Sequence, residues 1–111
     1  MTPEPKHAPI VPSYGAASLA DLHGPADGTV ELPLRLFWSS ADRSFELGDP
    51  DMARCLYETV LREATRPDDL AAYLDGAMLV RIWPRLFLPR GVRRAWEDAH
   101  SVLRAARTAA A

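Results

Sequence analysis

The stretch from residue 31 to residue 38 places an apolar side chain at every second position. These apolar residues are Leu32, Leu34, Leu36 and Trp38. Their alternation predicts a β-strand with one buried face, and Pro33, which has no N–H to donate, is expected at its start or on an open edge. Phe45 and Leu47 resume the alternation after a polar stretch at 39–43. We therefore predict a short hairpin, which must pack on other elements to be stable in water.

Helical spacing begins after residue 48. A helix start is present at Gly48-Asp49-Pro50-Asp51, because Asp49 can cap, Pro50 suits the first helical position and Asp51 favours the positive end of the helix dipole. One face of the following segment is apolar and consists of Ala53, Leu56, Tyr57, Val60, Leu61 and Ala64. We predict that this helix ends near Thr65, since the residue before Pro67 is steered away from helical geometry.

Three further helices are predicted. The second begins at Pro67 and is broken by Asp75-Gly76, the third covers 77–83 and stops at Pro84, and the last runs from 89 or 90 to about 107. Residues 86–88 are expected to form a buried connector. The predicted fold class is α+β, mainly α, with a short N-terminal β-hairpin packed on a bundle of about four helices.

The domain organisation follows from the distribution of proline and glycine. Six of the ten prolines lie in the first 33 residues, so residues 1–29 are expected to be a disordered arm. One stretch in it, 16–22, suits a helical turn formed on a partner, although a mere tail is favoured. Residues 30–107 are expected to form a single small domain, and residues 108–111 a disordered tail.

Composition narrows the class of protein. The chain has 111 residues, 48% apolar and 25% charged, with one cysteine, which excludes a scaffold held by internal disulfides. Its longest apolar runs are only a few residues, so no membrane association is expected. The first residues lack a basic start followed by an apolar stretch. We therefore expect a cytoplasmic protein without a signal peptide.

Charge is unevenly distributed. Residues 1–80 carry six basic and thirteen acidic side chains, a net of −7, whereas residues 81–111 carry seven arginines and two acids, a net of +5. Candidate contacts to nucleic acid or to a protein partner are Arg81, Arg85, Arg90, Arg93 and Arg94. The competing interpretation is internal: Arg93–Glu97 and Arg94–Asp98 are four residues apart, and Arg104 and Arg107 favour the negative end of their own helix.

The spacing of Ala72, Gly76 and Ile82 matches a helix-turn-helix unit, with a small residue before a turn glycine and a branched residue after it. Such a unit places its second helix in the major groove of DNA. Pro84 argues against it, because proline inside a recognition helix costs ~3 kcal/mol.

Residues suited to catalysis or metal binding are few. Cys55 has no histidine nearby in sequence to activate it, His7 and His23 fall in the arm, and His100 stands alone. Nucleophilic catalysis needs a base and an orienting group, and zinc needs three or four cysteine or histidine ligands. We expect neither an enzyme, nor a metal site, a cofactor or a small-molecule substrate.

Trp38, Trp83 and Trp96 admit two interpretations. Each lies at or near an element boundary and is expected in the core. Tryptophan beside arginine is also the usual anchor of a protein interface, so the three are candidate interface aromatics.

Several short strings give the chain a resemblance to a known group. They are Leu34 to Ser39, Phe45 to Pro50, Tyr57-Glu58 with Val60-Leu61, Trp83-Pro84, Leu88-Pro89 and Val92 to Glu97. In these strings the chain resembles small actinobacterial proteins that look like companions of nucleotidyltransferase-like toxins. The resemblance implies an antitoxin or regulator, and it carries over no functional residues.

The sequence thus favours a non-enzymatic protein-interaction or regulatory protein, antitoxin-like, that binds a protein partner or a second copy. Docking is expected through the hairpin and arm, or through the arginine-rich last helix. The alternative is a small nucleic-acid-binding transcriptional regulator that uses residues 70–94.

Overall fold

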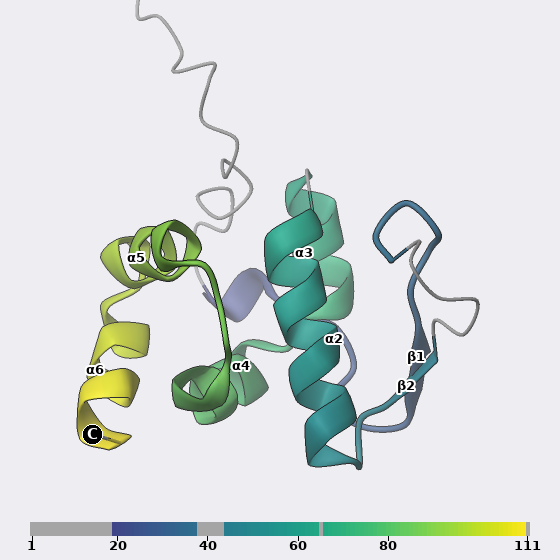
Figure 1. Cartoon of the computed structure of the whole chain (residues 1–111), viewed down its shortest axis with the longest axis horizontal. Coiled ribbons are helices and arrows are strands. Elements are labelled where there is room, and N and C mark those ends of the chain that lie inside the picture. Colours follow the sequence, from purple (N-terminus) through teal and green to yellow (C-terminus); the bar gives the residue numbers. More distant parts are fainter. Residues whose placement is uncertain (1–18, 38–43, 65, 111) are drawn as a thin grey trace, which may run out of the picture.

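The computed structural model describes residues 19–37, 44–64 and 66–110. The fold is α+β and mainly α, as predicted, with a two-stranded antiparallel sheet packed against the first long helix. In chain order the elements are η1 (Leu19–Asp21), β1 (Thr29–Glu31), β2 (Ser44–Glu46), α2 (Pro50–Glu63), α3 (Pro67–Tyr73), α4 (Gly76–Ile82), η2 (Trp83–Arg85), α5 (Arg90–Ala99) and α6 (Ser101–Ala110), where η denotes a 3-10 helix. Figure 1 shows the hairpin on one side of α2, with α5 and α6 on the other.

The hairpin is present, but its first strand lies earlier than the alternation predicted. Val30 pairs with Phe45 in the antiparallel register, and both side chains are buried. Gly28 adopts a φ of 82°, a left-handed value that suits glycine, and its carbonyl accepts from the N–H of Leu47 at 2.8 Å. The strand therefore begins beside a glycine turn and ends at Glu31.

Residues 33–37, which were predicted to be strand, form a turn. The N–H groups of Leu36 and Phe37 both donate to the carbonyl of Pro33, at 2.9 and 3.2 Å. Leu32 and Leu36 are buried, whereas Leu34 is 59% exposed, so burial follows a spacing of four residues rather than two. The fixed φ of Pro33 favours a turn at this point. Trp38 lies outside the described residues.

The prediction for α2 is confirmed. The carboxylate of Asp49 accepts from the N–H groups of Asp51 and Met52, at 2.9 and 3.4 Å, and Pro50 occupies the first helical position. The helix ends at Glu63 and buries the predicted apolar face.

The Asp75-Gly76 pair begins a helix as well as ending one. The side chain of Asp75 accepts from the N–H of Met78 at 2.9 Å, and Gly76 is the first residue of α4. The helix ends at Ile82, and Pro84 lies in the η2 turn that follows. Leu86 is buried in the connector to α5, but Phe87 is 84% exposed, so the prediction of a wholly buried connector was wrong at Phe87.

The last helix was predicted to be continuous to about 107, and it is broken at His100. The backbone of His100 is extended, with φ −135° and ψ 95°, and separates α5 from α6. This break lets α6 fold back on α5 and contact α4 and η2, where Leu103 is fully buried. The helix then continues to Ala110, so the tail predicted from residue 108 is helical through 110.

The described part of the predicted arm packs against the domain. Leu22 is buried, and residues 22–24 hydrogen-bond to the backbone between α3 and α4, including a bridge between His23 and Asp75. The single turn at Leu19–Asp21 lies on α4 of the same chain. The ordered domain thus begins by Leu19 rather than at residue 30, and residues 1–18 lie outside the described part.

The core is one cluster of buried apolar side chains drawn from every element from β1 to α6, together with Leu22, which follows η1. Its largest fully buried members are Trp83, Trp96 and Tyr57. None of the described helices is both long enough and apolar enough to cross a membrane.

Candidate functional site

The structure divides the five candidate arginines between two hollows. Arg81 and Arg85 line one, together with Arg54 of α2. Arg90, Arg93 and Arg94 line the other, on α5. The connector 86–89 lies between the two groups in the chain. The single basic patch predicted over 81–94 is therefore divided into two surfaces.

The first surface, which we call the α2–α4 hollow, lies between the start of α2 and α4 with η2. Its lining includes the apolar side chains of Ala53, Met78 and Ile82, and it has a volume of about 460 Å³. Met78 and Ala53 are almost fully buried and Ile82 is partly so. The arginines Arg54, Arg81 and Arg85 are exposed around this lining. The hollow therefore has an apolar floor and a rim of three arginines and one exposed acid, Asp51.

Two of these arginines, Arg81 and Arg85, have no ion-pair or hydrogen-bond partner among the described residues. Arg54 is held near Asp51 and Glu58, at 3.7 and 3.6 Å. Arg81 and Arg85 form no ion pair or side-chain hydrogen bond with any described residue. Arg81 lies in the last turn of α4, where a cation interacts favourably with the helix dipole. That interaction explains its helical position but leaves its guanidinium available.

Phe87, in the connector between η2 and α5, contacts α2 at Glu58, one helical turn after Arg54. Its N–H donates to Oε2 of Glu58 at 2.7 Å, the same oxygen that approaches Arg54. This bond fixes the backbone while the ring stays 84% exposed. The sequence predicted Phe87 to be buried; the signal for its exposure was the short span between Pro84 and Pro89, in which three consecutive apolar residues cannot all face the core.

Arg93 is a structural residue. Its guanidinium stacks over the ring of Trp83, with 4.8 Å from Cζ to the ring centroid. It also donates to the carbonyls of Trp83 and Leu86 and lies 3.6 Å from Glu97, so the predicted Arg93–Glu97 pair is present. Its role in binding nucleic acid or a partner remains a prediction, but its main contacts are internal.

Glu97 is the buried centre of this region. Oε2 accepts from Nε1 of Trp83 at 2.9 Å and from Nε of Arg107 at 2.7 Å. Burial alone would raise the pKa of Glu97, but the hydrogen bonds from Arg107 and Trp83, with the charges of Arg107 and Arg93, hold that pKa below its ordinary value. Trp83 and Trp96 have no exposed surface. They are core residues, as the sequence favoured, and an interface role for either remains a prediction.

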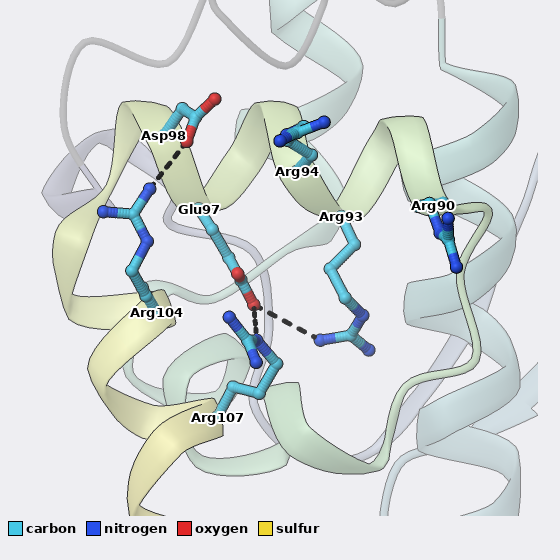
Figure 2. Close-up of a pocket in the computed structure, with 7 residues that line it drawn as sticks. All are labelled: Arg90, Arg93, Arg94, Glu97, Asp98, Arg104 and Arg107. Carbon is cyan, nitrogen blue, oxygen red and sulfur yellow. Dashed lines mark hydrogen bonds and ion pairs between the residues drawn. The ribbon is translucent and has the colours of Figure 1, made fainter.

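The second surface, which we call the α5–α6 hollow, is lined by charged side chains (Figure 2). Five are arginines: Arg90, Arg93 and Arg94 from α5, and Arg104 and Arg107 from α6. Arg94 and Asp98, which were predicted to pair, form no ion pair with each other. Asp98 instead accepts from Arg104 at 2.6 Å, which leaves Arg94 without an acidic partner among the described residues.

The helix-turn-helix spacing is not matched by the geometry of such a unit. Gly76 is the first residue of α4 rather than part of a turn between two helices, and it lies against the carbonyl of Leu19. The helix is seven residues long and packs mainly against η1, η2 and α6. A short helix enclosed in this way is a poor candidate for reading a DNA groove.

The remaining candidates for chemistry stand apart from one another. Cys55 is exposed on α2, whereas His100 is buried between α5 and α6. Across residues 19–37, 44–64 and 66–110, no three histidine, cysteine, aspartate or glutamate side chains come close enough to hold a metal ion.

Comparisons with protein-family models, with curated proteins and with solved structures found no match. The assignment of function therefore rests on the geometry of these two surfaces.

Proposed function

We propose that this chain is a non-enzymatic interaction protein that binds an acidic segment of a protein partner on the α2–α4 hollow and Phe87. The observation that carries the proposal is the exposure of Phe87 in the connector that follows η2, together with two arginines, Arg81 and Arg85, that have no partner among the described residues. A fully buried phenylalanine contributes ~1.5–3 kcal/mol relative to an exposed one. Because the connector leaves this ring exposed to water, the free energy of burying it can contribute to binding a partner.

The chemistry of the surroundings favours a protein segment. Aromatic and arginine side chains are the residue types enriched where partners bury surface. The apolar floor at Met78 and Ile82 offers a place for an apolar side chain, while Arg81 and Arg85 complement carboxylates on either side. A segment that alternates acidic and apolar residues fits both features.

A regulatory role of antitoxin type agrees with the resemblance to companions of nucleotidyltransferase-like toxins. In that case the partner is the toxin, and this chain acts by occupying its surface. The sequence predicted docking through the hairpin and arm or through the last helix. In this proposal the partner instead binds the face formed by α2, α4 and the connector.

Selection from a random peptide library displayed on phage tests the proposal without knowledge of the partner. We expect the full chain to enrich peptides in which acidic residues flank an apolar or aromatic one. Phe87→Ala should abolish that enrichment, and the double variant Arg81→Glu/Arg85→Glu should enrich basic peptides instead. The matched control is Arg62→Glu, which reverses the charge at an exposed arginine of α2 that lies outside both hollows.

Two outcomes contradict the proposal. One is enrichment that survives Phe87→Ala unchanged. The other is a dimer in sedimentation velocity that dissociates in Phe87→Ala, because the occupant of the face is then a second copy of this chain.

A further inference from the structure

The α5–α6 hollow carries more positive charge than its own acids neutralise. Glu97 and Asp98 are held by the arginines of α6, with Arg107 at 2.7 Å and Arg104 at 2.6 Å. Arg90 and Arg94 form no ion pair with any acid in the described ranges. Figure 2 shows these two along the same helix as Glu97 and Asp98, with no marked contact to either acid.

Helix stability does not account for Arg90 and Arg94. They lie in the first turns of α5, where the helix dipole is positive and acidic residues are favoured. That first turn has no acidic residue, and no side chain caps the helix. The packing of Arg93 on Trp83 gives that arginine a role in the fold, but Arg90 and Arg94 have no comparable contact among the described residues.

The lining of the hollow also restricts the ligand. The side chains that line it are all charged, so it offers neither an aromatic ring on which a base can stack nor an apolar floor for a protein side chain. Exposed charge pairs with a folded protein contribute little on their own. A chain of phosphates differs because its charges are dense and its binding releases condensed counterions.

From these observations we propose that the α5–α6 hollow binds a chain of closely spaced phosphates, as in a nucleic-acid backbone or inorganic polyphosphate, without reading base sequence. Arg90 and Arg94, one helical turn apart, supply the contacts, and arginine's planar fork suits phosphate oxygens. This site does not depend on the α2–α4 hollow or on the proposed protein partner.

The test measures binding of the full chain to a fluorescent single-stranded uridine oligonucleotide and to its adenosine counterpart at several salt concentrations. We expect similar affinity for the two. In Arg90→Ala/Arg94→Ala, the slope of log K against log salt should become shallower by about 1.4, since each contact to a single strand contributes ~0.7. Arg62→Ala, an exposed arginine on α2, is the matched control and should leave the slope unchanged. Both variants should keep the wild-type circular dichroism, because the replaced side chains make no hydrogen bond or ion pair in the part of the chain that the structure describes.

A competition experiment separates the sources of phosphate. Inorganic polyphosphate should displace the oligonucleotide, whereas the same concentration of phosphate as inorganic orthophosphate should not. Asp98→Asn should strengthen binding, because it releases Arg104. The proposal is overturned if polyphosphate fails to compete, if Arg62→Ala matches the double variant, or if no binding is measurable at low salt.

Discussion

The indole N–H of Trp83 donates a hydrogen bond of 2.9 Å to Oε2 of Glu97, and both side chains are buried. Arg107 reaches the same oxygen from α6. A single carboxylate therefore connects η2, α5 and α6 at the position where the chain folds back after His100.

Replacement of Glu97 tests this connection. In Glu97→Ala the Trp83 N–H is left without an acceptor, and an unsatisfied buried donor costs ~1–3 kcal/mol of unfolding free energy. Glu97→Gln keeps an acceptor oxygen but loses the charge, so its loss should be smaller. Urea unfolding followed by tryptophan fluorescence measures both variants.

The matched control for Glu97 is Asp98→Ala, which removes an exposed pair with Arg104 and should change stability by no more than about 1 kcal/mol. If Asp98→Ala destabilises the chain as much as Glu97→Ala, the buried hydrogen bond is not what holds η2 to α5.

Gly76→Ala tests the attachment of the N-terminal segment. A Cβ at Gly76 would lie within 2.3 Å of the carbonyl oxygen of Leu19, so residues 19–22 would have to move. We expect lower stability and faster amide exchange at Leu22 and His23. Gly91→Ala is the control, because a Cβ there meets nothing within 4 Å and alanine is favoured over glycine inside a helix by roughly 0.5–1 kcal/mol. Equal effects of the two substitutions would count against close packing of this segment.

The sequence predicted correctly those helix starts that depend on only a few neighbouring residues. The start of α2 needs only Asp49 and Pro50, and the start of α3 needs Pro67. Both helices therefore begin where the sequence indicated. The apolar face of α2 could be predicted because six residues recur at one helical spacing.

Long-range contacts determined the features that the sequence did not reveal. Alternation at 32–38 resembles a strand, but Arg35 binds Asp69 of α3, which holds residues 33–37 in a turn. The break at His100 has no glycine or proline to signal it. It follows from the burial of Leu103 against the rest of the bundle.

The candidate site was predictable only in part. The surplus of arginine after residue 80 is visible in the sequence, but which arginines are free depends on the pairing of Asp98 with Arg104 rather than Arg94. Phe87 could not be distinguished from Leu86 by residue type. Its exposure depends on how the connector crosses α2.

His100 should make stability depend on pH near neutrality. Burial lowers the pKa of His100 below its ordinary value of 6.5, and its buried Nε2 has no hydrogen-bond partner among the described residues. Above pH 6.5 the imidazole is neutral in both the folded and the unfolded chain. As the pH falls below 6.5 the unfolded chain takes up the proton first, so the free energy of unfolding should decrease.

Urea unfolding at pH 7.5 and 5.5 measures this decrease, and His100→Gln is the comparison. The variant need not be as stable as the wild type, but its unfolding free energy should change less between the two pH values. An equal change in both proteins would show that another group is responsible.

Arg35 should control stability at acid pH through Asp69. Two hydrogen bonds from Arg35, at 2.9 and 2.7 Å, are the main cause of the lowered pKa of Asp69, with smaller contributions from the charges of Arg35 and Arg66. The folded chain therefore keeps this carboxylate ionised below 3.8, its ordinary pKa. The resulting stability is present above pH 3.8 and is lost as the pH falls through the lower folded value.

Acid titration followed by circular dichroism tests this pair. Arg35→Ala should move the acid transition to higher pH, and Arg35→Lys should do so to a lesser extent, because lysine keeps the charge but cannot make two parallel hydrogen bonds. Amide exchange at Leu36 and Phe37 should accelerate in both variants, since their hydrogen bonds to Pro33 depend on the same turn. Arg66→Ala is the control, because the nearest Arg66 nitrogen lies 3.9 Å from Asp69, beyond hydrogen-bond distance. A larger acid shift in Arg66→Ala than in Arg35→Ala would refute the assignment of Arg35 as the residue that holds the turn.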